Sequence, residues 1–177
     1  MRLSNNYPIV AIIGDRGAGK TLTMRALAEN YKKEGLNIYA NFTMSDIDYT
    51  RIEFDDIVDF PEYLENGVIF LDEGHIGMDA YNFFSRKVKD STKFMTQTRK
   101  KKLTIYFSTQ IFSQVARRLR LLTNYIMECR ETDTSGLIYI SIFDRMKVAD
   151  NDGFIRELYL DGRPFFDKYD TDEIIAN

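Results

Sequence analysis

Residues 14–21 constrain the fold of this chain more than any other segment, because they fit the pattern G-x-x-x-x-G-K-[ST] at every position. The segment consists of Gly14, Asp15, Arg16, Gly17, Ala18, Gly19, Lys20 and Thr21. An apolar run with β-branched side chains, residues 7–14, leads into it, and an amphipathic stretch follows it. We therefore expect a buried parallel strand, a glycine-rich turn and a helix, in that order.

Each residue type in this segment suits the binding of a polyphosphate. The glycines let the backbone turn its N–H groups toward the phosphates. Lys20 can reach the β- and γ-phosphates, and the Thr21 hydroxyl can ligate Mg²⁺. The helix that continues through Leu22 adds its positive amino-terminal end. A chance match in a glycine-rich turn is the alternative, and the flanking strand and helix disfavour it.

Two adjacent acids, Asp72 and Glu73, end a second apolar run, residues 68–71. At the carboxyl end of a parallel strand, Asp72 would lie near the Mg²⁺ through a water molecule. Glu73 could act as the general base that polarises a water for in-line attack on the γ-phosphate. Two solvated acids at a strand end are the alternative. The pair follows the phosphate-binding segment with one predicted strand in between, and this position favours the catalytic interpretation.

The rest of the chain alternates apolar runs and amphipathic stretches, the pattern of an α/β fold. We expect one continuous domain over residues 1–177, with a core over 1–132 and a β-rich extension over 133–177. Turn signals at 133–136 and 150–153 favour antiparallel pairing within this extension. The predicted strands are 37–41, 52–54, 68–72, 103–109, 125–129, 137–143 and 154–160. The predicted helices are 21–33, 60–64, most of 79–102 with a break near Ser85, and 113–122.

Composition favours a folded domain of the cell interior. The chain is 44% hydrophobic, and its longest apolar run, Ile9 to Ile13, is far shorter than the ~20 residues that cross a bilayer. Its single cysteine, Cys129, cannot form an internal disulfide, which suits a reducing cytosol. One histidine, His75, argues against a zinc site of Cys and His ligands, and we expect it to be structural.

A net charge of −3 conceals an uneven distribution of charge. Residues 86–130 contain twelve Lys and Arg against two acids, whereas residues 150–177 contain three bases against eight acids. A concentrated basic segment is typical of a surface where phosphates dock. A solvated helix face is the alternative, and charge alone does not decide between the two.

Together these motifs resemble the FtsK–HerA superfamily of DNA-pumping ATPases. The resemblance is greatest to the small genome-packaging ATPases of archaeal viruses and to the zonula occludens toxin-like assembly ATPases of filamentous phages. It spans nearly the whole chain, and it is carried by residues 14–21, Asn41, 68–73, 97–100, 108–110, 118–120 and 169–173. It implies an additional-strand, RecA-like P-loop NTPase fold, with a mainly parallel sheet flanked by helices and a C-terminal antiparallel β extension. The strand 103–109 should then lie between the two motif strands.

The resemblance also implies a ring, expected to be a hexamer, with ATP at the subunit boundaries. A neighbour's arginine would stabilise charge on the γ-phosphate, with Arg118 and Arg120 as candidates and Arg99 as a third. Contact with DNA or simple solvation is the alternative for these arginines. Gln110 could sense the γ-phosphate or be an ordinary loop residue, and Asn41 could hold Glu73 inactive until substrate binds. A run of four bases could grip the backbone of double-stranded DNA without reading sequence: Arg99, Lys100, Lys101 and Lys102.

The leading hypothesis is therefore an ATP- and Mg²⁺-dependent motor that packages double-stranded viral DNA into a preformed capsid. It would dock on a capsid or portal-vertex protein, in the cytoplasm of the infected host or associated with the virion, with no integral membrane segment. A filamentous-virus assembly ATPase that extrudes phage through a membrane partner is the alternative within this fold. A slowly hydrolysing, nucleotide-gated scaffold is a third hypothesis. A nucleotide kinase is disfavoured, since no arginine-rich lid is found.

Overall fold

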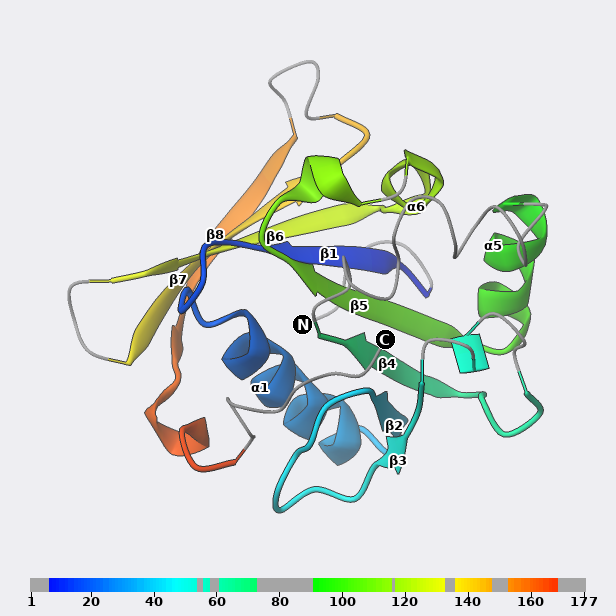
Figure 1. Ribbon diagram of the computed structural model, residues 1–177, viewed down its shortest axis with the longest axis horizontal. Helices are drawn as coiled ribbons and strands as arrows, with labels where there is room; N and C mark the ends of the chain where they lie inside the picture. Colours follow the sequence, from blue (N-terminus) through cyan, green and yellow to red (C-terminus); the bar gives the residue numbers. More distant parts are fainter. Residues whose placement is uncertain are drawn as a thin grey trace.

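A single eight-stranded sheet organises the computed structural model, which describes residues 7–53, 56–57, 61–72, 91–115, 117–132, 136–147 and 153–168. The strand order is β3-β2-β4-β5-β1-β6-β7-β8 (Figure 1). Neighbours from β3 to β6 pair in parallel, whereas β6–β7 and β7–β8 are antiparallel. The elements are β1 (Ile9–Ile13), α1 (Lys20–Lys33), β2 (Asn37–Ala40), β3 (Thr50–Arg51), β4 (Gly67–Leu71), α5 (Ser91–Lys100), β5 (Leu103–Thr109), η1 (Phe112–Gln114), α6 (Arg117–Leu122), β6 (Tyr125–Glu131), β7 (Leu137–Asp144), β8 (Phe154–Asp161) and η3 (Arg163–Phe165).

The predicted position of β5 is confirmed. Its register aligns Thr109 with Ile13 of β1 and Phe107 with Leu71 of β4, so β5 lies between the two strands that carry the motifs. Because all three strands are parallel, their carboxyl ends meet at one edge of the sheet. The predicted α/β fold with an antiparallel extension is likewise confirmed.

Helices cover both faces of the parallel part of the sheet, which explains its continuous apolar strands. On β1, Val10 and Ile12 pack in a cluster with the apolar residues of α1, while Ile9 and Ala11 pack toward Leu119 of α6. Figure 1 shows α1 and α6 on opposite sides of β1. No helix within the described ranges is long and apolar enough to cross a membrane.

Some predicted boundaries are wrong, and tertiary packing explains the differences. The strand expected at 52–54 lies earlier in the chain, as the two-residue β3. Ile52 directly follows β3: its N–H still donates to the carbonyl of Ala40 at 3.0 Å, and its side chain packs in the core. The helix expected over 113–122 is divided into η1 and α6 by Val115, which is extended and buried in the same cluster. Residues 61–64 form a turn rather than the end of a helix. Of the helix expected over 79–102, the structure describes α5, and residues 79–90 lie outside the described ranges.

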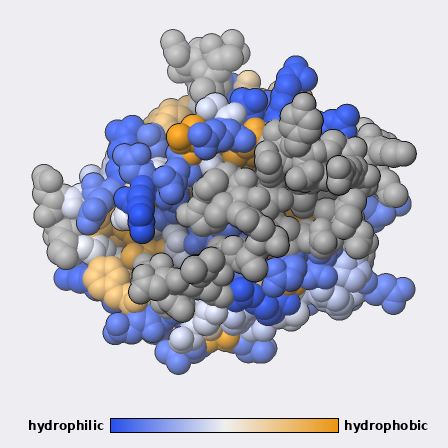
Figure 2. Space-filling view, viewed as in Figure 1, coloured by the Kyte–Doolittle hydropathy of each residue, from blue (hydrophilic) through white to orange (hydrophobic). Residues whose placement is uncertain are grey.

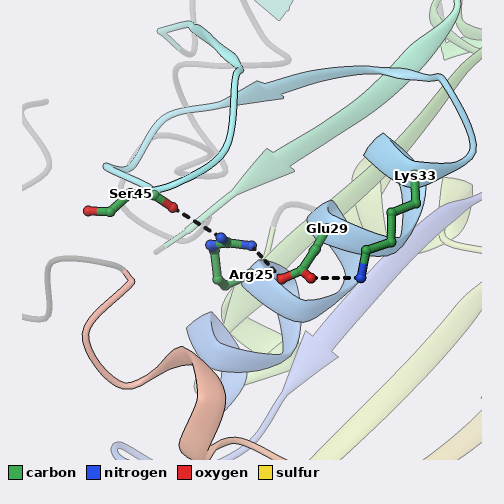
Figure 3. A network of polar contacts seen from close by, with 4 residues as sticks. All are labelled: Arg25, Glu29, Lys33 and Ser45. Atoms are coloured by element: carbon green, nitrogen blue, oxygen red, sulfur yellow. Dashed lines mark hydrogen bonds and ion pairs between the residues drawn. The ribbon is translucent and has the colours of Figure 1, made fainter.

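Arg25 links α1 to two distant segments, a role that its position in an amphipathic helix does not predict. Its side chain is 1% exposed, and its Nη2 donates to the carbonyl of Ser45 at 3.0 Å. On the other side, its guanidinium carbon lies 5.7 Å from the ring centroid of Phe165 in η3. Glu29 pairs with Arg25 at 3.5 Å and with Lys33 at 2.7 Å (Figure 3). Burial lowers the pKa of the Arg25 guanidinium, and the charge of Glu29 opposes that shift.

We predict that Arg25→Ala lowers the free energy of unfolding by about 2–4 kcal/mol, because it removes the buried stem that packs α1 against η3. Arg25→Met should stay within about 1 kcal/mol of the parent, since an apolar side chain of similar length often replaces a buried ion pair without loss. Lys33→Ala is the matched surface control and should change stability by less than about 0.5 kcal/mol. Urea denaturation measures all three, and an equal loss for Met and Ala would contradict the packing argument.

Candidate active site

The glycine-rich loop between β1 and α1 adopts the left-handed backbone conformations that its sequence predicts. Gly17 has a φ of 81° and Gly19 a φ of 84°. A Cβ added at Gly19 would collide with Cδ1 of Ile138 in β7, whereas one added at Gly17 would meet nothing within 4 Å. Gly19 is therefore required both by backbone conformation and by close packing on the β extension, and Gly17 by conformation alone.

The side chain of Lys20 folds back onto the loop that precedes it. Its Nζ donates to the carbonyl of Gly14 at 2.9 Å and to the carbonyl of Asp15 at 2.8 Å. The side chain is buried at 7% exposure, so its ammonium is held at the centre of the loop and not in bulk water. At the start of α1, the first N–H groups have no acceptor within the helix and carry a partial positive charge. The loop and helix start therefore offer a compact, positively charged surface to a phosphate.

The carboxylate of Asp72 joins the loop to the centre of the sheet. Its Oδ2 accepts a hydrogen bond from Thr21 Oγ1 at 2.6 Å, and its Oδ1 accepts one from the hydroxyl of Ser108. Thr21 lies at the start of α1, Asp72 directly after β4, and Ser108 near the end of β5. Hydroxyl and carboxylate oxygens are the hard ligands that Mg²⁺ prefers, so Thr21 and Asp72 fit the predicted metal site.

Asn41, which directly follows β2, fixes the backbone at the end of β4. Its Oδ1 accepts from the N–H of Asp72 at 2.7 Å, and its Nδ2 donates to the carbonyl of Asp72 at 3.1 Å. Both groups are buried, so the side-chain amide satisfies a donor and an acceptor that would otherwise be costly to bury. The predicted contact between Asn41 and Glu73 lies outside the described residues, as do Glu73, His75 and residues 169–173.

The predicted sensor and basic residues fall into two places. Gln110 is exposed and directly follows β5, at the sheet edge that carries the phosphate-binding loop. Residues 99–102 precede β5 and therefore lie at the opposite edge, because β5 runs parallel to β1. Arg99, Lys100 and Lys102 are exposed there, whereas Lys101 is half-buried and donates to the carbonyl of Pro61 at 2.9 Å.

The two candidate arginines of the connection between β5 and β6 lie on α6, which contacts α5. Arg118 is exposed, and Arg120 is half-buried. Together with Arg99 at the end of α5, they place positive charge on the face of the sheet opposite α1. The structure therefore brings together the loop, Asn41 and Asp72, and leaves the basic residues outside this group.

Ser108 is a site residue that the sequence analysis missed. The sequence segment 108–110 predicts a γ-phosphate sensor at Gln110 and does not indicate a contact between Ser108 and Asp72. Ser108 is fully buried, and its hydroxyl bonds directly to the carboxylate of Asp72. The available signal was a small polar residue near the carboxyl end of an otherwise apolar strand that lies between the two motif strands.

Cys129 of β6 lies beneath the loop, where a Cβ added at Gly14 would collide with its carbonyl. Its Sγ lies 3.6 Å from Thr23 Oγ1. Burial raises the pKa of the thiol to about 11, so the thiolate is disfavoured at neutral pH. The residue therefore supports the loop by packing and is not a nucleophile.

Comparison with known proteins agrees with this geometry. The AAA domain family matches residues 6–133. No curated protein matches the chain closely enough to count as a relative. The N-terminal domain of zonular occludens toxin from Neisseria meningitidis has a TM-score of 0.66 at 20% identity, covering 94% of this chain and 100% of that one. The genome packaging NTPase B204 from Sulfolobus turreted icosahedral virus 2, in complex with AMPPCP, has a TM-score of 0.58 at 12% identity, covering 86% and 97%. The flagellar accessory protein FlaH from Methanocaldococcus jannaschii has a TM-score of 0.56 at 12% identity, covering 78% of both chains.

Substitution by alanine should destabilise the fold less at Gly17 than at Gly19. Gly17→Ala should lower the free energy of unfolding by about 1–2 kcal/mol, the cost of a left-handed conformation in a residue with a Cβ. Gly19→Ala should cost roughly 1–3 kcal/mol more, because the added methyl also overlaps Ile138. Thermal or urea denaturation compares the variants. In the double variant Gly19→Ala/Ile138→Ala the excess cost should shrink, and strictly additive effects would contradict a direct contact.

Proposed function

The chain belongs to the AAA domain family, and we propose that it is an ATPase that binds ATP and Mg²⁺ at residues 14–22. The single observation that carries this proposal is the bond between Thr21 and Asp72, which joins the helix start behind the loop to the acid after β4. In P-loop NTPases, a loop hydroxyl and a strand-end aspartate hold the magnesium of the bound nucleotide. Two motifs 51 residues apart in sequence thus meet at the position where that chemistry needs them.

We assign the chain's own residues the following roles. The amides of the loop and helix start bind the phosphates, and the ammonium of Lys20 exchanges its loop carbonyls for phosphate oxygens. Thr21 and Asp72 hold Mg²⁺, which when bound neutralises charge developing on the phosphates. Glu73, directly after Asp72 in the sequence, accepts a proton from the water that attacks the γ-phosphorus. Asn41 keeps the end of β4 in place, so that Asp72 keeps its position.

We further propose that hydrolysis drives the movement of double-stranded DNA, most simply to package a viral genome. The exposed bases near the start of β5 support this, as does the likeness to a genome packaging NTPase. Arg99 lies at the sheet edge opposite its own phosphate-binding loop, so a role beside a γ-phosphate requires the site of another subunit. We therefore propose a ring, expected to be a hexamer, in which a neighbour supplies Arg99, Arg118 or Arg120. A capsid or portal-vertex protein would anchor such a ring.

A filamentous-virus assembly ATPase is the second candidate. The toxin domain has a higher TM-score than the packaging NTPase, 0.66 against 0.58, and its match covers more of this chain. Both candidates use the same hydrolytic site, so they differ in what the motor moves and not in the chemistry. DNA-stimulated hydrolysis by the purified protein favours packaging, whereas hydrolysis that depends on a membrane partner favours assembly.

We predict that Lys20→Ala and Glu73→Gln each reduce ATP hydrolysis at least about 100-fold. Lys20→Ala should also weaken ATP binding, because it removes the ammonium of the loop, whereas Glu73→Gln should bind ATP nearly as tightly as the parent. Phosphate release and nucleotide binding by calorimetry measure the two effects, with Lys33→Ala as a control of the same helix. Full hydrolysis by Glu73→Gln would contradict its role as general base.

The basic segment predicts salt-sensitive DNA binding. Arg99→Glu/Lys100→Glu should weaken binding to duplexes of different sequence equally and reduce the slope of log K against log salt by about 2. Lys32→Glu/Lys33→Glu makes the same change of charge at the end of α1 and should leave the slope nearly unchanged. Fluorescence anisotropy between 50 and 200 mM salt tests this. Equal losses for the two double variants would show that total charge, and not this surface, governs binding.

A further inference from the structure

Two neighbouring residues at the start of α1 face different parts of the fold. Thr21 bonds Asp72 at the centre of the sheet. Leu22 lies beside Gly162, which directly follows β8: a Cβ added at Gly162 would lie only 3.3 Å from Leu22 Cδ1. A triphosphate whose terminal phosphates lie beside Lys20, Thr21 and the metal site therefore presents its nucleoside away from Asp72. The residues around Gly162 lie on that side of the helix.

An exposed aromatic ring lies at this place. Phe166, directly after η3, is 46% exposed, and its Cζ would lie 3.2 Å from a Cβ added at Gly136. Gly136 in turn accepts a hydrogen bond at its carbonyl from the N–H of Gly162 at 2.7 Å. A continuous set of contacts thus links Phe166 through these glycines and Ile138 to Gly19 of the phosphate-binding loop. In Figure 2, hydrophobic atoms are exposed at the lower left, beside the region where Figure 1 shows η3.

The ring is carried on a segment that is fixed from both sides. Arg163 donates to both carboxylate oxygens of Asp161, at 2.8 Å and 2.7 Å, which closes the turn after β8. On the inner side, Phe165 packs under the buried guanidinium of Arg25 in α1. Because Leu22 and Arg25 lie one helical turn apart on the same face of α1, η3 has a fixed position relative to the loop. The backbone that carries Phe166 is therefore fixed on both sides, by the turn at Asp161 and by α1.

We propose that Phe166 is the platform on which the base of the bound nucleotide stacks. The inference rests on the proposed function and adds to it the side of α1 on which the nucleoside lies and the residue that holds the base. A phenyl ring stacks on the π-face of any base, so Phe166 would raise the affinity for a nucleoside triphosphate without selecting one base. The stem of Arg163, whose Cδ would lie 3.3 Å from a Cβ added at Gly136, borders the same surface.

The absence of tryptophan from the sequence allows a direct test. Phe166→Trp should bind ATP as the parent does, and the fluorescence of this sole tryptophan should change when ATP is added. Inorganic tripolyphosphate with Mg²⁺ occupies the loop without a base and should leave the fluorescence unchanged. Phe154→Trp is the matched control, since Phe154 is 54% exposed at the other end of the β7–β8 hairpin. Its fluorescence should respond to neither ligand.

Affinity measurements complete the test. Phe166→Leu, which keeps an apolar side chain but cannot stack, should bind ATP about tenfold more weakly and tripolyphosphate within twofold of the parent. Unchanged ATP affinity would overturn the platform while leaving the ATPase proposal intact. An equal loss for both ligands would also overturn it, because the residue would then act on the loop and not on the base. If the parent bound neither ligand, the proposed function would fail and the platform with it.

Discussion

The carboxylate of Asp72 is the point at which the central elements of this protein meet. It accepts hydrogen bonds from the hydroxyl groups of Thr21 at the start of α1 and Ser108 in β5. The side-chain amide of Asn41, after β2, bonds both backbone groups of Asp72. Four segments far apart in the sequence are therefore fixed around one buried acid. An unpaired carboxylate at such a depth would be costly, so these partners stabilise the fold as well as arrange the site. The oxygen atoms that meet there, from Thr21 and Asp72, are those to which we assign Mg²⁺ in the proposed function.

Much of the fold follows from the sequence because its strongest signals are local. The pattern at residues 14–21 predicts a strand, a turn and a helix. The strand predicted at 103–109 is an apolar run that is buried throughout as β5, and the strand predicted at 37–41 is present as β2 at 37–40. The division of the helix expected over 113–122 could not be foreseen, since Val115 is extended only because the core accepts its side chain there. Likewise, hydrophobicity predicts a strand that begins at Ile52, whereas the structure has Ile52 directly after β3, bonded to Ala40 and buried in the core.

The part of the candidate site that lies in the two sequence motifs, residues 14–21 and 68–73, could be predicted from the sequence. Lys20, Thr21 and Asp72 lie together as expected, and the sequence placed Asn41 and the segment 108–110 near them. The partner of each polar group cannot be read from the sequence. Ser108 and Gln110 are equally polar and, being two residues apart, would face the same side of an extended strand. What distinguishes them is that β5 ends at Thr109, so that Ser108 is buried within the strand and Gln110 lies beyond it. The burial of Arg25 could not be predicted from the sequence, since a basic residue in a helix is ordinarily solvated.

The strand β5 runs from the basic residues 99–102 to the end of the sheet that carries the phosphate-binding loop. Basic residues precede it, and the serine that bonds the central acid lies near its end. Its seven residues are buried throughout and hydrogen-bonded to a neighbour on each side, so over a length of about 23 Å it is among the stiffest parts of the chain. Because β1 and β4 are bonded to it along most of its length, β5 can shift only together with these neighbours and not alone. The spacing between the basic residues and Ser108 is therefore as constant as the sheet itself.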